Sequence, residues 1–153
     1  MSGFIALQSA AAGEIANAAF FPTITLAELR AVARIDGTVP DERLVEAAAV
    51  AMSAVNTDLA AYQADQEALG ITTLAAVPAT QLGGRSRLVR LYLRAIYALT
   101  KADLLERYRD FDAANSGRAR EDDLDTPAAE LRRNARLAVR EILGIPRVTA
   151  ELI

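Results

Sequence analysis

Residues 85–112 form one long amphipathic segment, and no other part of the sequence limits the possible folds as strongly. Its apolar side chains recur at steps of three and four residues, the spacing that places them on one face of a helix. Basic side chains follow the same period on a second face. We therefore expect one helix here that packs through its apolar face and displays a basic stripe. The apolar positions are Leu88, Leu91, Tyr92, Ala95, Ile96, Leu99 and Ala102, and the basic ones are Arg87, Arg90, Arg94 and Lys101.

A short helix is expected earlier in the chain. Thr25 and Glu28 have the spacing of a capping box, in which a hydroxyl and a carboxylate each meet a free backbone amide. The helix should end at about Ile35, because Asp36-Gly37 is typical of a helix stop.

A second helix is predicted from Pro40 to Leu69, where apolar residues again recur at steps of three and four and Gly70 follows the end. Pro40 suits the first turn because its missing N–H is not needed there. At the usual rise this helix would be about 45 Å long. We expect it to lie antiparallel to residues 87–111.

The remaining segments are a connection, a loop and a last helix. Residues 71–84 contain Pro and Gly-Gly breaks, and Ser86 is expected to cap the helix that follows. Residues 115–125 are polar and charged, which predicts a loop. The last helix should open at Thr126-Pro127 and end at Gly144. Its predicted buried positions are Leu131, Ala135, Ala138 and Ile142, and its predicted exposed ones are Arg132, Arg136 and Arg140.

The fold class predicted from these patterns is all-α: a small bundle of long antiparallel amphipathic helices. Residues 1–19 are expected to be a flexible N-terminal arm, residues 20–145 the helical domain, and residues 146–153 an extended C-terminal tail. The tail is apolar, β-branched and led by proline, which favours an extended strand over a helix. No basic segment opens the chain and no apolar run reaches about 20 residues, so neither a secretory signal nor a membrane partner is expected.

Composition argues against an enzyme. The 153 residues include no His and no Cys, which removes the commonest general base and excludes Ser-His-Asp and Cys-His catalysis. Residues 112–123 match a calcium loop incompletely, and the acidic run at 121–125 is explained by a solvated loop before a helix N-terminus. We therefore expect no catalytic residue, no cofactor and no metal.

Charge is divided unevenly between the two halves. Residues 1–84 carry three bases and nine acids, a net charge of −6, whereas residues 85–153 carry fourteen bases and eleven acids, a net charge of +3. The whole chain has a net charge of −3, which has the wrong sign for a dedicated nucleic-acid binder. An exposed charged helix face is the default explanation of the basic stripe, and a protein partner is the better functional one.

One set of short pieces lies in order along nearly the whole chain. It comprises Phe20-Phe21-Pro22, RIDGTV at 34–39, Arg43-Leu44, Asn56, Leu59, Tyr62, LAAVPA at 74–79, Gly84, Ser86, Tyr92, Arg94-Ala95, LERYR at 105–109, Asp112, Glu130-Leu131, Arg136, Ala138-Val139 and Arg147. In order and spacing these pieces resemble the head completion proteins of contractile-tailed bacteriophages, the gpL type. Residues 1–19 and 115–125 match this family little.

The resemblance implies a non-enzymatic, mainly helical adaptor domain over residues 20–145. Such a subunit would join the portal vertex after DNA packaging, help retain the genome and present a surface for tail attachment. Implied partners are the portal protein, tail-terminator or neck proteins, copies of itself in a dodecameric ring, and the packaged DNA that passes through the channel. The resemblance places it in the virion, and in the host cytoplasm during assembly, with a monomer expected for the isolated chain.

The expected interface with the portal or a neighbouring subunit combines the basic stripes and the tail. Acidic side chains on the 40–69 helix are expected near Arg87, Arg90 or Arg94 of the adjacent subunit. The alternative function is a small helical nucleic-acid-binding regulator that uses the Arg-rich face. The candidate interface residues are Arg87, Arg90, Arg94, Arg132, Arg136, Arg140, Arg147, Val148, Leu152 and Ile153.

Overall fold

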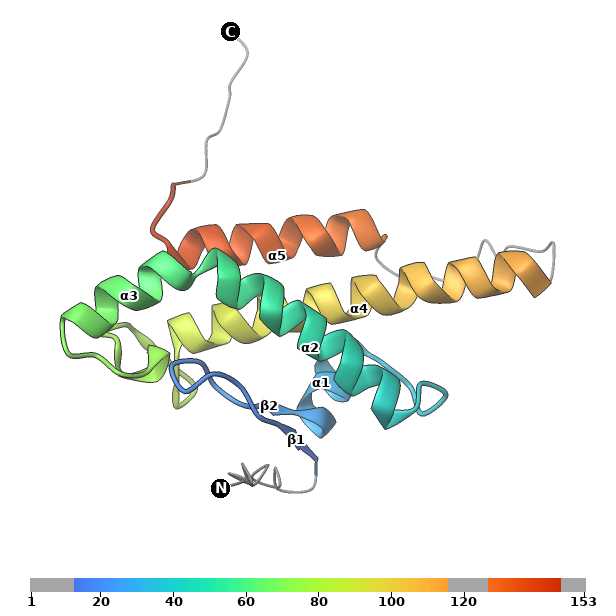
Figure 1. Ribbon diagram of the computed structural model, residues 1–153, viewed down its shortest axis with the longest axis horizontal. Coiled ribbons are helices and arrows are strands. Elements are labelled where there is room, and N and C mark those ends of the chain that lie inside the picture. The colour runs from blue at the N-terminus through green and yellow to red at the C-terminus, as the bar shows by residue number, and fades with distance from the viewer. Residues whose placement is uncertain (1–12, 116–126, 147–153) are drawn as a thin grey trace, which may run out of the picture.

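The computed structural model describes residues 13–115 and 127–146, and within these ranges helices dominate (Figure 1). The helices are α1 (Leu26–Ala33), α2 (Asp41–Asp58), α3 (Ala60–Ala68), α4 (Arg87–Asn115) and α5 (Ala128–Ile142), with a 3-10 turn at Leu74–Ala76. The strands are β1 (Glu14–Ile15), β2 (Ile24–Thr25), β3 (Gln81–Leu82) and β4 (Arg85–Ser86). They form two small antiparallel sheets, β1–β2 and β3–β4. The prediction of a mainly helical fold is confirmed, but the strict all-α class is wrong.

Helix α4 is the central element, and α5 lies along it while α2 crosses it (Figure 1). The predicted apolar stripe of α4 is confirmed, with Tyr92, Ala95 and Ile96 completely buried. Burial extends further around the helix than one stripe, because Val89 and Leu93 are also covered. A helix packed on several sides buries more of its circumference than a surface helix does.

The predicted 40–69 helix is wrong as a single element, because it breaks at Leu59 into α2 and α3, which are bent by 59°. Asn56, Thr57 and Asp58 precede the break, and all three have low helix propensity. In addition, the Thr57 hydroxyl donates a hydrogen bond to the Ser53 carbonyl at 2.8 Å, a back-bond that bends helices. Leu59 itself is completely buried, so the bend is fixed by the core. Gly70 follows α3 with a φ of +83°, as predicted for a helix stop.

The start and end of α1 differ from the predicted pattern. The Thr25 side chain makes no capping hydrogen bond, and Glu28 is turned toward Arg85 instead, so the predicted capping box is wrong. The helix ends at Arg34, which adopts the left-handed conformation with φ 55°, ahead of the predicted stop at Asp36-Gly37. Arg34 is the one non-glycine residue with positive φ in the described ranges.

A β-hairpin replaces the first turn predicted for the long helix. Gly83 and Gly84 have φ values of 59° and 73°, and two such residues form the tight turn that joins β3 to β4. Glycine suits position 83 because of this positive φ, and an added Cβ would also lie 2.8 Å from the Arg90 guanidinium, which would have to move. Helix α4 therefore begins at Arg87, and the Leu88 amide donates to the Ser86 hydroxyl at 3.2 Å, which confirms the predicted cap.

The N-terminal segment is attached to the core from Gly13 onward. Strand β1 pairs with β2, and the Leu26 amide donates to the Gly13 carbonyl at 2.8 Å. Asn17 reaches into the interior, where its amide group donates to the hydroxyl of the buried Tyr92 at 2.8 Å. Residues 13–19 of the expected arm thus belong to the packed structure, and residues 1–12 lie outside the described ranges.

The last helix follows the sequence prediction. In α5, Ala135, Ala138 and Ile142 are buried, Leu131 is partly buried, and Gly144 ends the helix with φ 69°. The loop predicted at 115–125 and the tail predicted at 146–153 fall almost entirely outside the described residues, so both remain predictions. In the described part of the chain no single helix is long and apolar enough to cross a membrane, although the bent pair α2 and α3 meets the length and composition test together.

Candidate functional site

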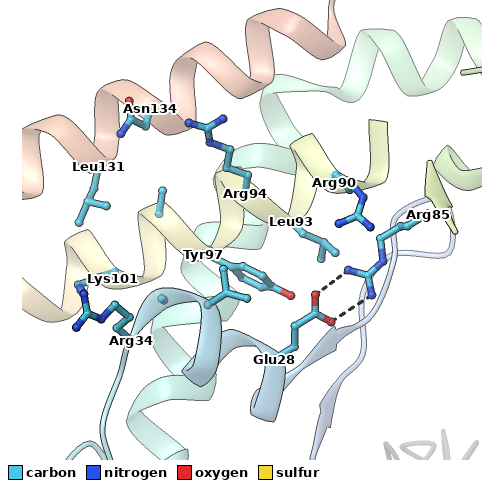
Figure 2. A pocket seen from close by; sticks show the side chains of 13 residues that line it. Glu28, Arg34, Arg85, Arg90, Leu93, Arg94, Tyr97, Lys101, Leu131 and Asn134 are labelled. Carbon is cyan, nitrogen blue, oxygen red and sulfur yellow. Dashed lines mark hydrogen bonds and ion pairs between the residues drawn. The ribbon is translucent and has the colours of Figure 1, made fainter. Parts of the chain in front are cut away.

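A groove of about 520 Å³ lies where α1, α4, α5 and the β3–β4 hairpin meet (Figure 2). Its apolar side chains come from α1, α4 and α5, and its charged side chains come from α1 and its C-terminal end, from β4 and from α4. We call this feature the basic groove. It is lined by Glu28, Val32, Ala33, Arg34, Arg85, Arg90, Leu93, Arg94, Tyr97, Ala98, Lys101, Leu131 and Asn134.

One end of the basic groove is closed by an ion pair between α1 and β4. The Arg85 guanidinium donates two hydrogen bonds to the Glu28 carboxylate, at 2.7 and 3.2 Å (Figure 2). These bonds lower the pKa of Glu28 and raise the pKa of Arg85, in each case against a smaller opposing effect of burial. Such a bidentate pair fixes both side chains and neutralises one of the cations that line the groove.

Arg34, Arg90 and Arg94 also line the groove, and none of them pairs with a carboxylate in the described ranges. Arg90 is held by the hairpin, because its guanidinium donates to the Leu82 carbonyl at 2.6 Å and to the Gly83 carbonyl at 3.3 Å. The side chains of Arg34 and Arg94 make no hydrogen bond or ion pair with any residue in the described ranges, and both residues are exposed. Arg34 also holds a left-handed backbone conformation that costs about 1 kcal/mol or more for a residue other than glycine. This conformation ends α1, where the Arg34 backbone N–H donates to the Arg30 carbonyl.

The wall beside Glu28 is formed by Tyr97, whose hydroxyl points toward the Glu28 carboxylate in Figure 2. The Tyr97 hydroxyl is buried and has no hydrogen-bond partner in the described part of the chain. Burial, with a further contribution from the negative charge of Glu28, raises the pKa of Tyr97 to about 12. The Tyr97 hydroxyl therefore stays protonated and uncharged, and the Tyr97 ring adds to the apolar surface of the groove.

The structure places the predicted interface residues at different sites, and some of them pair with carboxylates of the same chain. It brings Arg90 and Arg94 together in the basic groove. Arg87 pairs with Glu141 at 2.9 Å, and Arg132 pairs with Glu106 at 3.1 and 2.5 Å, so these two join α4 to α5 within one chain.

The remaining predicted residues lie elsewhere. Arg140 donates to the Pro146 carbonyl at 3.2 Å, and Arg136 lines a smaller cavity of about 160 Å³ beside Asp58. The tail residues Arg147, Val148, Leu152 and Ile153 lie outside the described residues.

Among the residues of the groove that the sequence did not single out are Glu28, Arg34, Arg85 and Tyr97. Arg34 and Glu28 reach it only because α1 packs against α4, a long-range contact that no local spacing signals. Tyr97 gave a weak signal, since it lies beside the predicted apolar stripe of α4. The described residues contain no group of three or more His, Cys, Asp or Glu side chains that is arranged to hold a metal ion.

The fold and the groove define a small, mainly helical protein whose main surface feature is a basic groove with an apolar floor. The chain belongs to the family of phage head completion proteins (GPL), whose family model matches residues 15–153. It is also 41% identical over 133 residues to the head completion/stabilization protein of Escherichia phage P2, across 87% of this chain and 79% of that relative. No solved structure matches. The resemblance stated from the sequence is thus confirmed, and the chain is a structural component of phage head completion.

Proposed function

We propose that this protein joins the portal vertex of the filled head, helps retain the packaged genome and presents a surface for tail attachment. Membership of the head completion family supports the general role. The observation that carries the proposal is the basic groove, in which Arg34 and Arg94 flank an apolar floor and remain free for a partner. A surface of this chemistry suits a protein segment that combines apolar and acidic side chains.

The distribution of charge favours a protein partner over DNA. Arg87 and Arg132 of the predicted basic face are neutralised by carboxylates of the same chain. The chain as a whole also carries a net charge of −3, whereas tight DNA binding uses many phosphate contacts. The alternative of a nucleic-acid-binding regulator is accordingly the weaker proposal.

We further propose that copies associate head to tail in a ring that matches the portal, with twelve copies as the family resemblance suggests. Such a ring needs two different complementary faces on each subunit. Acidic side chains on α2 and α3 supply one face, and the basic groove supplies the other. Because Arg87 and Arg90 are already engaged within the chain, Arg94 is the stripe residue best placed to meet a neighbour's carboxylate.

Restoring DNA retention to incomplete heads tests this function. Heads filled in an infection that lacks the protein should lose their DNA to added nuclease. Adding the purified chain should increase the protected DNA at least about tenfold, since sealing at one vertex blocks the exit. The measurement is the nuclease-resistant DNA per head. Equal protection with and without the protein would contradict the proposal, and salt-sensitive binding to free DNA without association with heads would favour the regulator instead.

A further inference from the structure

Helix α3 is an unusually exposed element at one end of the molecule (Figure 1). None of its residues is buried. Ala61, Asp65 and Leu69 follow one another at steps of four, so they share one side of the helix and its end, and all three are exposed. Leu69 is 74% exposed, the highest value among the large apolar side chains of the described residues. This ridge of α3 therefore combines an apolar anchor with a carboxylate.

The chain around α3 carries negative charge only. Residues 44–84 contain the acids Glu46, Asp58, Asp65 and Glu67 and no Lys, Arg or His. The Asp65 side chain makes no hydrogen bond or ion pair with another described residue. An acidic element of this kind is attracted to a cationic surface and repels a second copy of itself.

The basic groove offers the complementary features. Val32 on α1 lines it and is 60% exposed, second only to Leu69 among the large apolar side chains that the structure describes. Arg34 and Arg94, two exposed cations whose side chains make no hydrogen bond or ion pair in the described ranges, lie on the same groove (Figure 2). The groove thus presents an exposed apolar side chain beside positive charge. The ridge of α3 presents an exposed apolar side chain beside negative charge, so the two surfaces are complementary.

We propose that α3 of one copy docks in the basic groove of the next copy, with Leu69 against Val32 and Asp65 beside Arg34 and Arg94. A chain does not make this contact with itself, because α3 lies at one end of the molecule while α1 lies below the middle of α4 (Figure 1). The contact joins two different surfaces, so repeating it generates a closed ring or an open filament. This inference rests on the proposed function, since it names the elements through which the subunits of the ring meet.

Disulfide trapping in assembled heads tests the contact directly, because the chain has no cysteine of its own. The double variant Val32→Cys/Leu69→Cys is supplied to an infection that lacks the protein, and purified heads are treated with the thiol oxidant diamide. We expect a ladder of covalently linked copies on a non-reducing gel, each step a disulfide between position 32 of one copy and position 69 of the next. The matched control is Val50→Cys/Leu69→Cys, which uses an exposed valine of α2 outside the groove.

The outcomes separate the docking contact from the general role. A ladder for the first pair that is at least about tenfold stronger than for the control supports docking of α3. Heads that contain the variant but yield no ladder, or equal ladders for both pairs, overturn the docking contact and leave the head role intact. If purified heads do not contain even the wild-type protein, this result overturns the proposed function itself.

A charge exchange gives a second measurement that does not depend on cysteines. Arg94→Glu should lower the copy number per head at least about tenfold, because two carboxylates would face each other across the contact. Adding Asp65→Arg to the same chain should restore it, whereas Arg133→Glu, an exposed arginine of α5 outside the groove, should have no effect. Wild-type copy number for Arg94→Glu, or no recovery in the double variant, would overturn the inference.

Discussion

Tyr92→Phe is expected to lower the free energy of unfolding by about 1–3 kcal/mol, although it removes one oxygen atom. The Tyr92 hydroxyl donates to the Asn56 side-chain carbonyl at 2.6 Å and accepts from the Asn17 amide at 2.8 Å. The Asn56 amide in turn donates to the Asn17 carbonyl oxygen at 2.9 Å. Tyr92 is completely buried and its ring stacks on Phe21, whereas both asparagines are partly buried, so water replaces the lost bonds only incompletely. The substitution removes a hydrogen-bond partner from polar groups of both asparagines. Leaving a buried polar group without its partner costs more stability than removing both partners together.

This network joins three segments that are distant in sequence: the N-terminal segment, α2 and α4. A double-mutant cycle between Tyr92→Phe and Asn56→Ala, measured by urea unfolding, should give a coupling energy of about 0.5–3 kcal/mol. Tyr97→Phe is the matched control, because this buried tyrosine lies on the same helix and lacks a hydrogen-bond partner in the described ranges. It should change stability by less than about 1 kcal/mol. Equal losses at the two tyrosines, or no coupling with Asn56, would contradict the network.

Deleting residues 146–153 is expected to abolish portal binding and leave the helical fold intact. The segment is apolar, β-branched and led by proline, a composition that suits strand addition to a partner or the filling of its groove. Of this segment the structure describes Pro146 alone, whose carbonyl accepts one exposed hydrogen bond from Arg140 after the end of α5. The loss of helix measured by circular dichroism should therefore be slight.

Pull-down on immobilised portal rings measures the effect of this deletion. Binding should fall at least about tenfold, a change of at least about 1.4 kcal/mol. Deleting residues 2–9 removes the same number of residues at the other end and is the control. Unchanged portal binding without the tail would refute the tail's role, and loss of helix on its removal would show that it stabilises the fold instead.

The sequence predicted those elements whose signals are local. The apolar stripe of α4 and the glycine that ends α5 depend on residues within a few turns of one another, and both are confirmed. The break at Leu59 depends on a back-bond from Thr57 and on burial of the bend, which overrode a helical pattern that continues through it. The β3–β4 hairpin was missed because strands of two residues are too short to show alternation.

The basic groove was predicted in part for the same reason. Arg90 and Arg94 share a helix face, so their spacing placed them together. Glu28 and Arg34 join them through the packing of α1 on α4, and Arg85 joins them because the hairpin turns its side chain toward α1. Ion pairs within the chain then removed Arg87 and Arg132 from the predicted basic face. Sequence spacing identifies which charges share a face, but not which of them are neutralised by another helix.

Sedimentation of the wild-type protein with portal rings of the same phage tests the central claim most directly. The protein should move with the rings, and the mass of the complex should correspond to one copy per portal subunit. Recovery of the protein entirely in the slow fraction, with the rings at their original mass, would contradict its role at the portal vertex.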